Sequence, residues 1–403
     1  MTDSIKISRQ QSKKYQLTRP LGIEKRYCLA PKNSLYFSRN GSITACCYNK
    51  KYELGRYPAD LPSAVWSSDR LAHLQRVFDS GQLISGCEGC AEQIEAGNVE
   101  NTLAKNFDRY AEFPLKAFPI RLLKAGLRGS SVLWNQIKAE GRRIKYGTGL
   151  PTTDSKMPKL LEFELSNTCN LECAMCFGEF SSSIRRNREH LPALADVYDA
   201  KFVKDLDHFL PHIWEAKFYG GEPFLIPLYY EIWDKIRKCN PKAQIHITTN
   251  GSILNQKVRT VLKTLNIHLI LSIDSFEPET YEAIRKNANF ETVMSNLQYF
   301  NQVLQQKNRD LIISICPTIL NAHEIPDMVE RCNKNGWYLH FNTVWWPEDL
   351  SLRKLPKPWL NDLILQYRKA AGGRASQSNP LNQAKFSGLI NQLISWRDAQ
   401  NDD

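Results

Sequence analysis

The chain has 403 residues, of which 42% are hydrophobic and 24% are charged. This length exceeds one average domain, and the apolar share excludes a disordered chain. The formal net charge of +11 favours an acidic partner, such as an anionic substrate, a carrier or nucleic acid, although a basic surface needs no partner. No apolar run approaches the roughly 18–20 residues of a membrane span, and the polar N-terminus lacks a secretory signal. We therefore expect a cytoplasmic protein without membrane contact.

The N-terminal part is predicted to contain a loose basic arm, residues 1–27, and a compact cysteine-bearing α+β module, residues 28–95. Two short strands flank Asn40-Gly41, a dipeptide typical of hairpin turns because both residues tolerate positive φ. A helix is expected over Ser68–Asp79. The module is followed by a mostly helical, basic connector, residues 96–157.

Residues 158–346 alternate between predicted strands and helices. Six strands are expected, at Leu160–Leu165, Ala216–Tyr219, Gln244–Thr249, His268–Ile273, Leu311–Thr318 and Tyr338–Val344. Helical segments lie between most of them, as at Leu225–Cys239 and Ile325–Lys334, which is typical of parallel βα units. The predicted fold class is therefore α/β, a partial (β/α)6 barrel preceded by the small module and the connector.

The two ends of this barrel segment carry further predictions. Glu162 and Glu164 alternate with apolar residues in the first strand; the alternatives are that these carboxylates point into the barrel or are exposed, and we expect exposure. Residues 347–403 form an extension with one amphipathic helix. Its apolar stripe is expected to pack on the core and consists of Phe386, Leu389, Ile390, Leu393 and Ile394.

Three cysteines follow the first strand of the barrel segment with the spacing C-x3-C-x2-C: Cys169, Cys173 and Cys176. Three thiolates within eight residues of a loop converge easily on one small object, and thiolates suit iron–sulfur clusters or zinc. Structural zinc normally takes four ligands, and no fourth Cys or His is adjacent. A cluster held by three cysteines keeps one iron open for a substrate or cofactor.

This loop resembles that of the radical S-adenosylmethionine (SAM) superfamily, and further segments resemble that family in the correct order. They are Gly220-Gly221-Glu222-Pro223 after the second strand, Thr248-Thr249-Asn250-Gly251 at the end of the third, Ser272-Ile273-Asp274 at the end of the fourth, and then Tyr281 and Arg285. The resemblance covers roughly residues 158–345. It departs from the family at Met175, where an aromatic residue near adenine is common; Met can still pack against the ring.

The resemblance implies that Cys169, Cys173 and Cys176 are the catalytic cluster ligands and hold a 4Fe-4S cluster. Its open iron would chelate the amino and carboxylate groups of S-adenosylmethionine. Reductive cleavage would then give a 5′-deoxyadenosyl radical that abstracts a substrate hydrogen. The implied cofactor-binding residues are Met175, Gly220, Gly221, Glu222, Pro223, Thr249, Asn250, Ser272, Asp274 and Arg285.

The N-terminal module carries its own cysteine set: Cys28, Cys46, Cys87 and Cys90. Four thiolates suffice for a closed site, either zinc or a second, auxiliary 4Fe-4S cluster. The pattern C-x12-G-x4-C with a later C-x2-C resembles the SPASM and twitch auxiliary-cluster modules, which favours the cluster. Cys47 is an alternative ligand, although the spacing from Gly41 favours Cys46. Cys239, Cys316 and Cys332 are expected to be buried structural cysteines, with a catalytic thiol at Cys316 as the alternative.

The substrate is left open between three hypotheses. SPASM and twitch relatives favour oxidation or cross-linking of a peptide or protein, and an acidic peptide would suit the basic chain. The alternative is dehydrogenation or rearrangement of a small sugar, nucleotide or aminocyclitol. A nucleic-acid-binding iron–sulfur or zinc protein is disfavoured, because the basic connector lacks interleaved aromatic residues. A flavodoxin- or ferredoxin-type reductant is expected as a partner.

Overall fold

The computed structural model describes residues 5–20, 23, 25–111, 156–373 and 379–400. Its strands, in chain order, are β1 (Ser34–Ser38), β2 (Ser42–Thr44), β3 (Gly55–Arg56), β4 (Leu160–Glu164), β5 (Glu215–Phe218), β6 (Gln244–Thr249), β7 (Ile267–Ser272), β8 (Leu311–Ile315) and β9 (Tyr338–Phe341).

The helices fall into three groups along the chain. The N-terminal group is α1 (Arg9–Leu17), α2 (Ala30–Asn33), α3 (Pro62–Trp66), α4 (Asp69–Asp79), α5 (Glu88–Glu95) and α6 (Leu103–Asn106). The central group is α9 (Ser182–Asn187), α10 (Ala200–Asp205), α11 (Pro227–Cys239), α12 (Gln256–Thr264), α13 (Pro278–Ile284), α14 (Phe290–Gln306) and α15 (Ile325–Lys334). The C-terminal group is α16 (Lys357–Ala371) and α18 (Pro380–Asp398).

All nine strands form one sheet, in the order β3-β2-β1-β4-β5-β6-β7-β8-β9. The six predicted barrel strands are β4 to β9, and each pairs in parallel with the next, so the predicted α/β class is confirmed. The predicted hairpin is also present, because β1 and β2 are antiparallel and Gly41 takes a φ of +86° in the turn. The sequence did not predict that β1 would pair in parallel with β4, with Tyr36 opposite Glu162.

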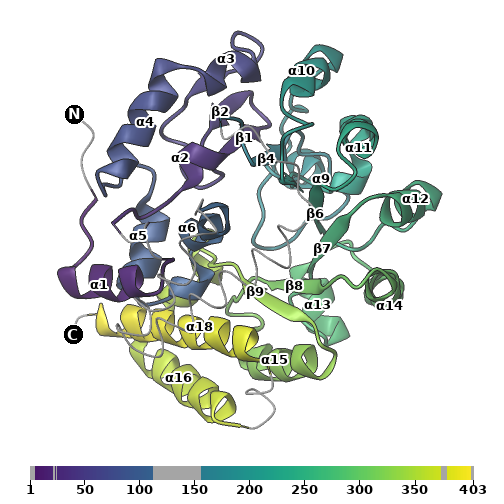
Figure 1. Cartoon of the computed structure of the whole chain (residues 1–403). Coiled ribbons are helices and arrows are strands. Elements are labelled where there is room, and N and C mark those ends of the chain that lie inside the picture. The colour runs from purple at the N-terminus through teal and green to yellow at the C-terminus, as the bar shows by residue number, and fades with distance from the viewer. Residues whose placement is uncertain (1–4, 21–22, 24, 112–155, 374–378, 401–403) are drawn as a thin grey trace.

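The sheet curves into an open barrel with helices around its outer side. In Figure 1 the strands run in an arc from β1 to β9, and α10, α11, α12, α14 and α15 surround its outer face. On β6, the residues that face these helices, such as Ile245 and Ile247, are fully buried, whereas the alternate residues His246 and Thr248 are only partly buried. The interior-facing side of β6 is therefore partly reached by solvent.

Helix α18 closes the side of the barrel next to β9. It packs against β9 and α16 and also contacts the N-terminal segment at Val99–Asn101. The Asn382 side chain accepts a hydrogen bond of 2.8 Å from the Leu339 N–H, which fixes the helix beside β9. Phe386, Leu389, Ile390 and Leu393 are buried and Ile394 packs on the core, so the predicted apolar stripe is confirmed.

Other expectations were wrong or cannot be placed. Part of the arm expected to be loose is the helix α1, whose Tyr15 is fully buried and donates a hydrogen bond of 2.9 Å to the Tyr27 carbonyl. Cys239, expected to be buried, is exposed at the last residue of α11. Cys332 is buried as expected. Residues 112–155, which make up most of the basic connector predicted over residues 96–157, lie outside the described residues.

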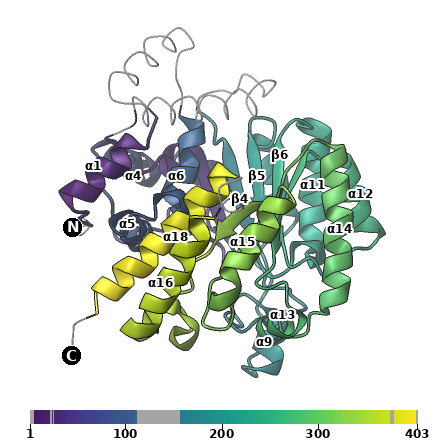
Figure 2. The ribbon, with the colours of Figure 1, turned by 90° about the horizontal axis from the view of Figure 1, so that it is seen from below.

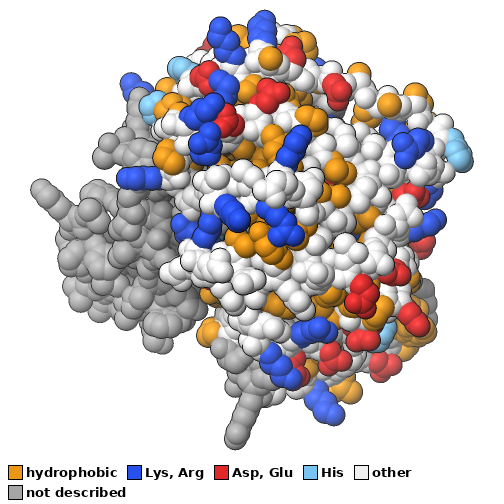
Figure 3. Space-filling model, turned by 90° about the vertical axis from the view of Figure 1, so that its right-hand side faces the viewer, with side chains coloured by type: hydrophobic (Ala, Val, Ile, Leu, Met, Phe, Trp, Pro, Cys, Tyr) orange, Lys and Arg blue, Asp and Glu red, His pale blue; other side chains and the backbone are white. Residues whose placement is uncertain are grey.

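Charge is mixed on the outer surface of the barrel. On the face in Figure 3, lysine and arginine side chains are interspersed with aspartate and glutamate. None of the helices described is long and apolar enough to cross a membrane.

Candidate active site

The three-cysteine loop follows β4 and is fixed to the chain segments around it. The Cys169 N–H donates to the Ser182 hydroxyl at 3.1 Å, and the Ala174 N–H donates to the Ile284 carbonyl at 2.7 Å. Ser182 begins α9 and Ile284 ends α13. Figure 2 shows α9 and α13 at the same end of the barrel. The loop therefore lies at the carboxyl end of the parallel strands, where open α/β folds bind their ligands.

The thiols of the loop are partly shielded from water. Burial, together with the neighbouring thiols, raises the pKa of Cys176 to about 12, and burial raises the pKa of Cys169 to about 11. Burial also raises the pKa of Cys173, opposed by the positive charge of Arg285. In the metal-free protein these thiols are protonated at neutral pH, and metal binding would release their protons.

Glu222 is the centre of one buried polar network behind the loop. Its carboxylate accepts hydrogen bonds of 2.8 Å from the Thr249 hydroxyl and 2.8 Å from the Asn250 N–H. The side-chain amide of Asn250 donates a 3.1 Å hydrogen bond to the side-chain oxygen of Asn170, which lies inside the cysteine loop. Burial raises the pKa of Glu222 to about 7, although these donors oppose the shift. The carboxyl group is thus poised between its two protonation states near neutral pH.

Asp274 and Arg285 form a second network on the other side of the loop. The fully buried Asp274 accepts 2.7 Å hydrogen bonds from Arg285 Nε and from the Cys316 N–H. Arg285 Nη1 lies 3.8 Å from the Cys173 sulfur. A fixed guanidinium at this distance stabilises thiolate over thiol. Cys316, predicted as structural or catalytic, is partly buried and lies close to Asp274.

Gly220 and Gly221 let the strand end approach the loop closely. A Cβ on Gly220 would lie 2.5 Å from the Ser166 carbonyl oxygen, and one on Gly221 would lie 2.2 Å from that of Thr168. The Glu222 N–H donates to the same Thr168 carbonyl at 2.7 Å. These contacts require glycine at both positions.

The remaining predicted cofactor residues occupy the same end of the barrel. Pro223 is buried and begins a short 3₁₀ helix that Glu222 caps. Ser272 is the partly buried last residue of β7, and Met175 is partly buried in the cysteine loop. The residues predicted to bind the cofactor therefore lie together around the cysteine loop. Their role in binding stays a prediction. Asn170 and Ser252, joined by a 2.9 Å hydrogen bond, belong to the same network and were not predicted.

The four N-terminal cysteines line one cavity. Cys28, Cys46, Cys87 and Cys90 all contribute to its wall, and the rest of the wall is mostly apolar. Three of the sulfurs accept N–H hydrogen bonds. The Ala30 N–H donates to Cys28 at 3.3 Å, the Asn49 N–H donates to Cys46 at 3.5 Å, and the Asn49 side-chain amide donates to Cys87 at 3.4 Å. In the described ranges, no three His, Cys, Asp or Glu side chains gather as ligands of a single metal ion. The nature of any bound group stays a prediction.

Cys47 occupies different surroundings from Cys46. It does not line the N-terminal cavity; burial and the negative charge of Glu162 raise the pKa of its thiol well above the usual value. Lys217 and Glu164 also act on this thiol. These three side chains belong to β4 and β5, so the Cys47 thiol faces the barrel interior.

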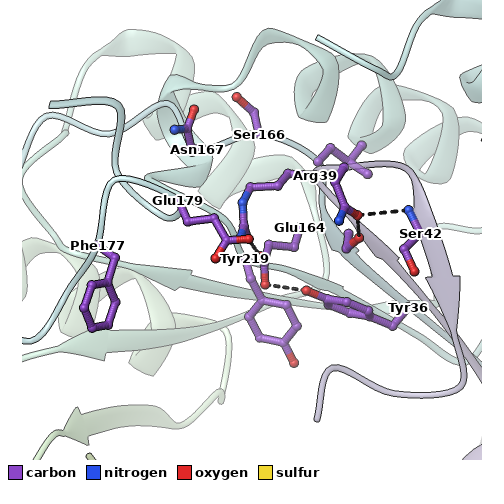
Figure 4. A network of polar contacts seen from close by, with 12 residues as sticks. Tyr36, Arg39, Ser42, Glu164, Ser166, Asn167, Phe177, Glu179 and Tyr219 are labelled. Carbon is purple, nitrogen blue, oxygen red and sulfur yellow. Dashed lines mark hydrogen bonds and ion pairs between the residues drawn. The ribbon is translucent and has the colours of Figure 1, made fainter. Parts of the chain in front are cut away.

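The expectation that Glu162 and Glu164 are exposed was wrong, since both are buried and face the barrel interior. Figure 4 shows Glu164 between Tyr36 and Arg39. The Glu164 carboxylate accepts a 2.5 Å hydrogen bond from the Tyr36 hydroxyl and forms an ion pair with Arg39. Arg39 also pairs with Glu179. The alternation of β4 was predicted, but its polar face meets side chains on and after the neighbouring strands β1 and β5 instead of open solvent.

The fold and site together define a parallel α/β barrel with a three-thiol loop and two buried polar networks at its carboxyl end. Residues 163–332 match the Radical SAM superfamily, and this places the barrel of the chain in that superfamily. Membership implies a 4Fe-4S cluster and S-adenosylmethionine as cofactors. Three soft thiolate donors beside a guanidinium suit such a cluster, so the residues present fit the implied group.

Named relatives match the same part of the chain. A probable GTP 3′,8-cyclase of Methanococcus maripaludis is 29% identical over 181 residues, 44% of this chain and 57% of that protein. The antilisterial bacteriocin subtilosin biosynthesis protein AlbA of Bacillus subtilis is 25% identical over 186 residues, 45% of this chain and 38% of that protein. The chain thus spans about half the length of these relatives. Among solved structures, native anSMEcpe with bound AdoMet aligns with a TM-score of 0.40 and 19% identity, over 52% of this chain and 60% of that one.

Proposed function

We propose that this protein is a radical SAM enzyme that modifies a peptide or protein, with its reaction centre at the carboxyl end of the barrel. The observation that carries the proposal is the convergence of two buried networks, around Glu222 and around Asp274, on the loop of Cys169, Cys173 and Cys176. When bound, the 4Fe-4S cluster and S-adenosylmethionine supply a 5′-deoxyadenosyl radical that abstracts hydrogen from the substrate.

The side chains of this protein would hold and orient these groups. The three thiolates hold the cluster, and Arg285 favours the ionised form of Cys173 from 3.8 Å. Burial raises the pKa of the Glu222 carboxyl group to about 7, and an ammonium group beside it would favour its charged form. In the resemblance on which the proposal rests, this Glu holds the amino group of the methionine moiety. Asp274 fixes the Arg285 side chain by their 2.7 Å contact.

The N-terminal cavity is proposed to hold an auxiliary 4Fe-4S cluster. Four thiols line it, and three of them receive N–H donors, an arrangement that stabilises thiolate ligands. Burial raises the pKa of Cys46 to about 12, so metal binding must displace its proton. The role of this cluster would be to accept or relay electrons, with a flavodoxin- or ferredoxin-type protein as the external reductant.

The test is anaerobic reconstitution with iron and sulfide, followed by dithionite and S-adenosylmethionine. We expect about eight irons per chain, as two 4Fe-4S clusters require, and formation of 5′-deoxyadenosine. Replacing Cys169, Cys173 and Cys176 with Ala should abolish 5′-deoxyadenosine and leave about four irons. Replacing Cys28, Cys46, Cys87 and Cys90 with Ala is the matched control and should also remove about four irons. Cofactor cleavage by the first variant would refute the assignment.

A second candidate function is chemistry on a small nucleotide or sugar. It is favoured by the relative named a probable GTP 3′,8-cyclase, whereas the relative named for subtilosin biosynthesis favours a peptide. GTP added to the reconstituted protein should not raise 5′-deoxyadenosine formation above the substrate-free rate if the substrate is a peptide. A saturable increase with GTP would favour the second candidate.

A further inference from the structure

The barrel interior contains two carboxylates on one strand whose environments differ. Glu162 and Glu164 are two residues apart on β4 and both point inward, about 7 Å apart along the strand. Glu164 is fully engaged, because Tyr36 donates to one oxygen and Arg39 pairs with the other. Figure 4 shows this arrangement.

Glu162 is engaged through one oxygen only. Its Oε2 accepts a 2.8 Å hydrogen bond from the Tyr219 hydroxyl and lies 3.8 Å from Lys217 Nζ. Its Oε1 is fully buried, and within the described part of the chain no donor reaches it. A buried carboxylate oxygen without a donor is costly, because the lost hydration is not replaced by a hydrogen bond. Such a group in a folded protein calls for a specific explanation, of which a functional role is one.

The surroundings of Glu162 connect it to the proposed reaction centre. Tyr219, its hydrogen-bond donor, directly precedes Gly220 and is only partly buried, as are Lys217 and Cys47. Along the strand, Glu162 lies four residues before Ser166, about 13 Å at a typical rise per residue. A group anchored at Glu162 would therefore extend toward the cysteine loop over the length of one or two extended side chains.

We propose that Glu162 is a substrate-binding residue whose free oxygen takes a cationic amino or guanidino group of the substrate. The inference rests on the proposed function, because it places this group in the barrel below the reaction centre. Lys217 Nζ lies 3.8 Å from the other oxygen, and the buried Oε1 has no donor among the described residues. A cationic donor would satisfy both the charge and the hydrogen-bonding capacity of the carboxylate. The same chemistry belongs to a basic side chain of a peptide and to an aminocyclitol.

The test measures binding without turnover, on reconstituted protein with S-adenosylmethionine. Two cationic probes, N-acetyl-lysine amide and 2-deoxystreptamine, are compared with two neutral ones, N-acetyl-norleucine amide and myo-inositol, by calorimetry or saturation-transfer NMR. We expect at least one cationic probe to bind at least about tenfold more tightly than its neutral partner, about 1.4 kcal/mol. The cationic probe that binds better identifies the source as peptide or small molecule.

Variants connect this preference to Glu162. In E162Q the cationic preference should disappear, while the K217M variant, which removes the competing cation, should bind the cationic probe severalfold more tightly. The melting temperature provides a check that needs no ligand. E162Q should melt no lower than the wild-type protein, whereas E164Q, which removes the buried one of the two carboxylates that pair with Arg39, should melt lower.

Three results would overturn the inference: neither cationic probe binds the wild-type protein, E162Q keeps the preference, or E162Q is destabilised as much as E164Q. Because binding is measured without cofactor cleavage, a wild-type protein that fails to form 5′-deoxyadenosine would refute the proposed function alone.

Discussion

The close contact between Gly221 and the cysteine loop gives a quantitative prediction for Gly221→Ala. An alanine Cβ would lie 2.2 Å from the Thr168 carbonyl oxygen, whereas ordinary contact begins at 3.4 Å. The backbone on one side must therefore retreat by about 1.2 Å, the difference between these distances. Thr168 directly precedes Cys169, and its carbonyl also accepts the 2.7 Å hydrogen bond from the Glu222 N–H. Overpacking costs about 1–3 kcal/mol, and loss of that hydrogen bond about 0.5–1.5 kcal/mol.

Two measurements check this prediction. The melting temperature of the metal-free G221A protein should fall by several degrees, and iron after anaerobic reconstitution should fall by up to about four atoms per chain. Gly372→Ala is the matched control, because its Cβ would lie 3.6 Å from the Lys369 carbonyl oxygen, an ordinary contact, and its φ of −76° suits alanine. If the G221A and wild-type proteins have the same melting temperature and bind the same amount of iron, the loop does not depend on this contact and the reasoning fails.

Three further predictions test other parts of the structure. Exposed Cys239 should react with a thiol reagent before buried Cys332 in the metal-free protein, as mass spectrometry of the labelled peptides will show. Phe386→Ala, at a fully buried position of α18, should lower the free energy of unfolding by about 3–5 kcal/mol, whereas Leu365→Ala, 71% exposed on α16, should change it by less than about 0.5 kcal/mol. Burial and the charge of Arg309 lower the pKa of His268 to about 4, so the folded imidazole stays neutral while the unfolded one takes up a proton below about 6.5. The contribution of His268 to the free energy of unfolding is complete above pH 6.5 and is lost toward pH 4, by up to about 3 kcal/mol. In urea unfolding, His268→Asn should therefore reduce the fall in this free energy between pH 7 and pH 5.

The elements that sequence periodicity predicted well are those whose signals are local. The structure places β6 at Gln244–Thr249 and α15 at Ile325–Lys334, with the predicted bounds. In β6, alternation distinguishes the helix-facing residues from the interior-facing ones. In α15, proline in the first turn and basic residues in the last mark the ends. Both signals lie within the element, so no knowledge of distant contacts is needed.

Features that depend on distant segments were not predictable in this way. The pairing of β1 with β4 joins Tyr36 to Glu162, far apart in the chain, and no local pattern specifies it. The same pairing explains the error at Glu162 and Glu164, because alternation gives two faces without saying what covers each. Their polar face is covered by side chains of the two neighbouring strands, β1 and β5, and of the residues that follow them. The Glu162 oxygen that lacks a donor could only be recognised once these contacts were known.

The continuous sheet also brings two adjacent cysteines next to both the N-terminal cavity and the barrel. Cys46 and Cys47 follow β2, which belongs to the same sheet as the barrel strands. The chain bends at both residues, and Cys46 lines the N-terminal cavity with Cys28, Cys87 and Cys90, whereas Cys47 does not. Burial raises the pKa of both thiols, and the negative charge of Glu162, inside the barrel, adds to the shift at each of them. The proposed auxiliary site therefore lies beside the barrel interior, joined to it by one stretch of chain that follows a strand of the shared sheet.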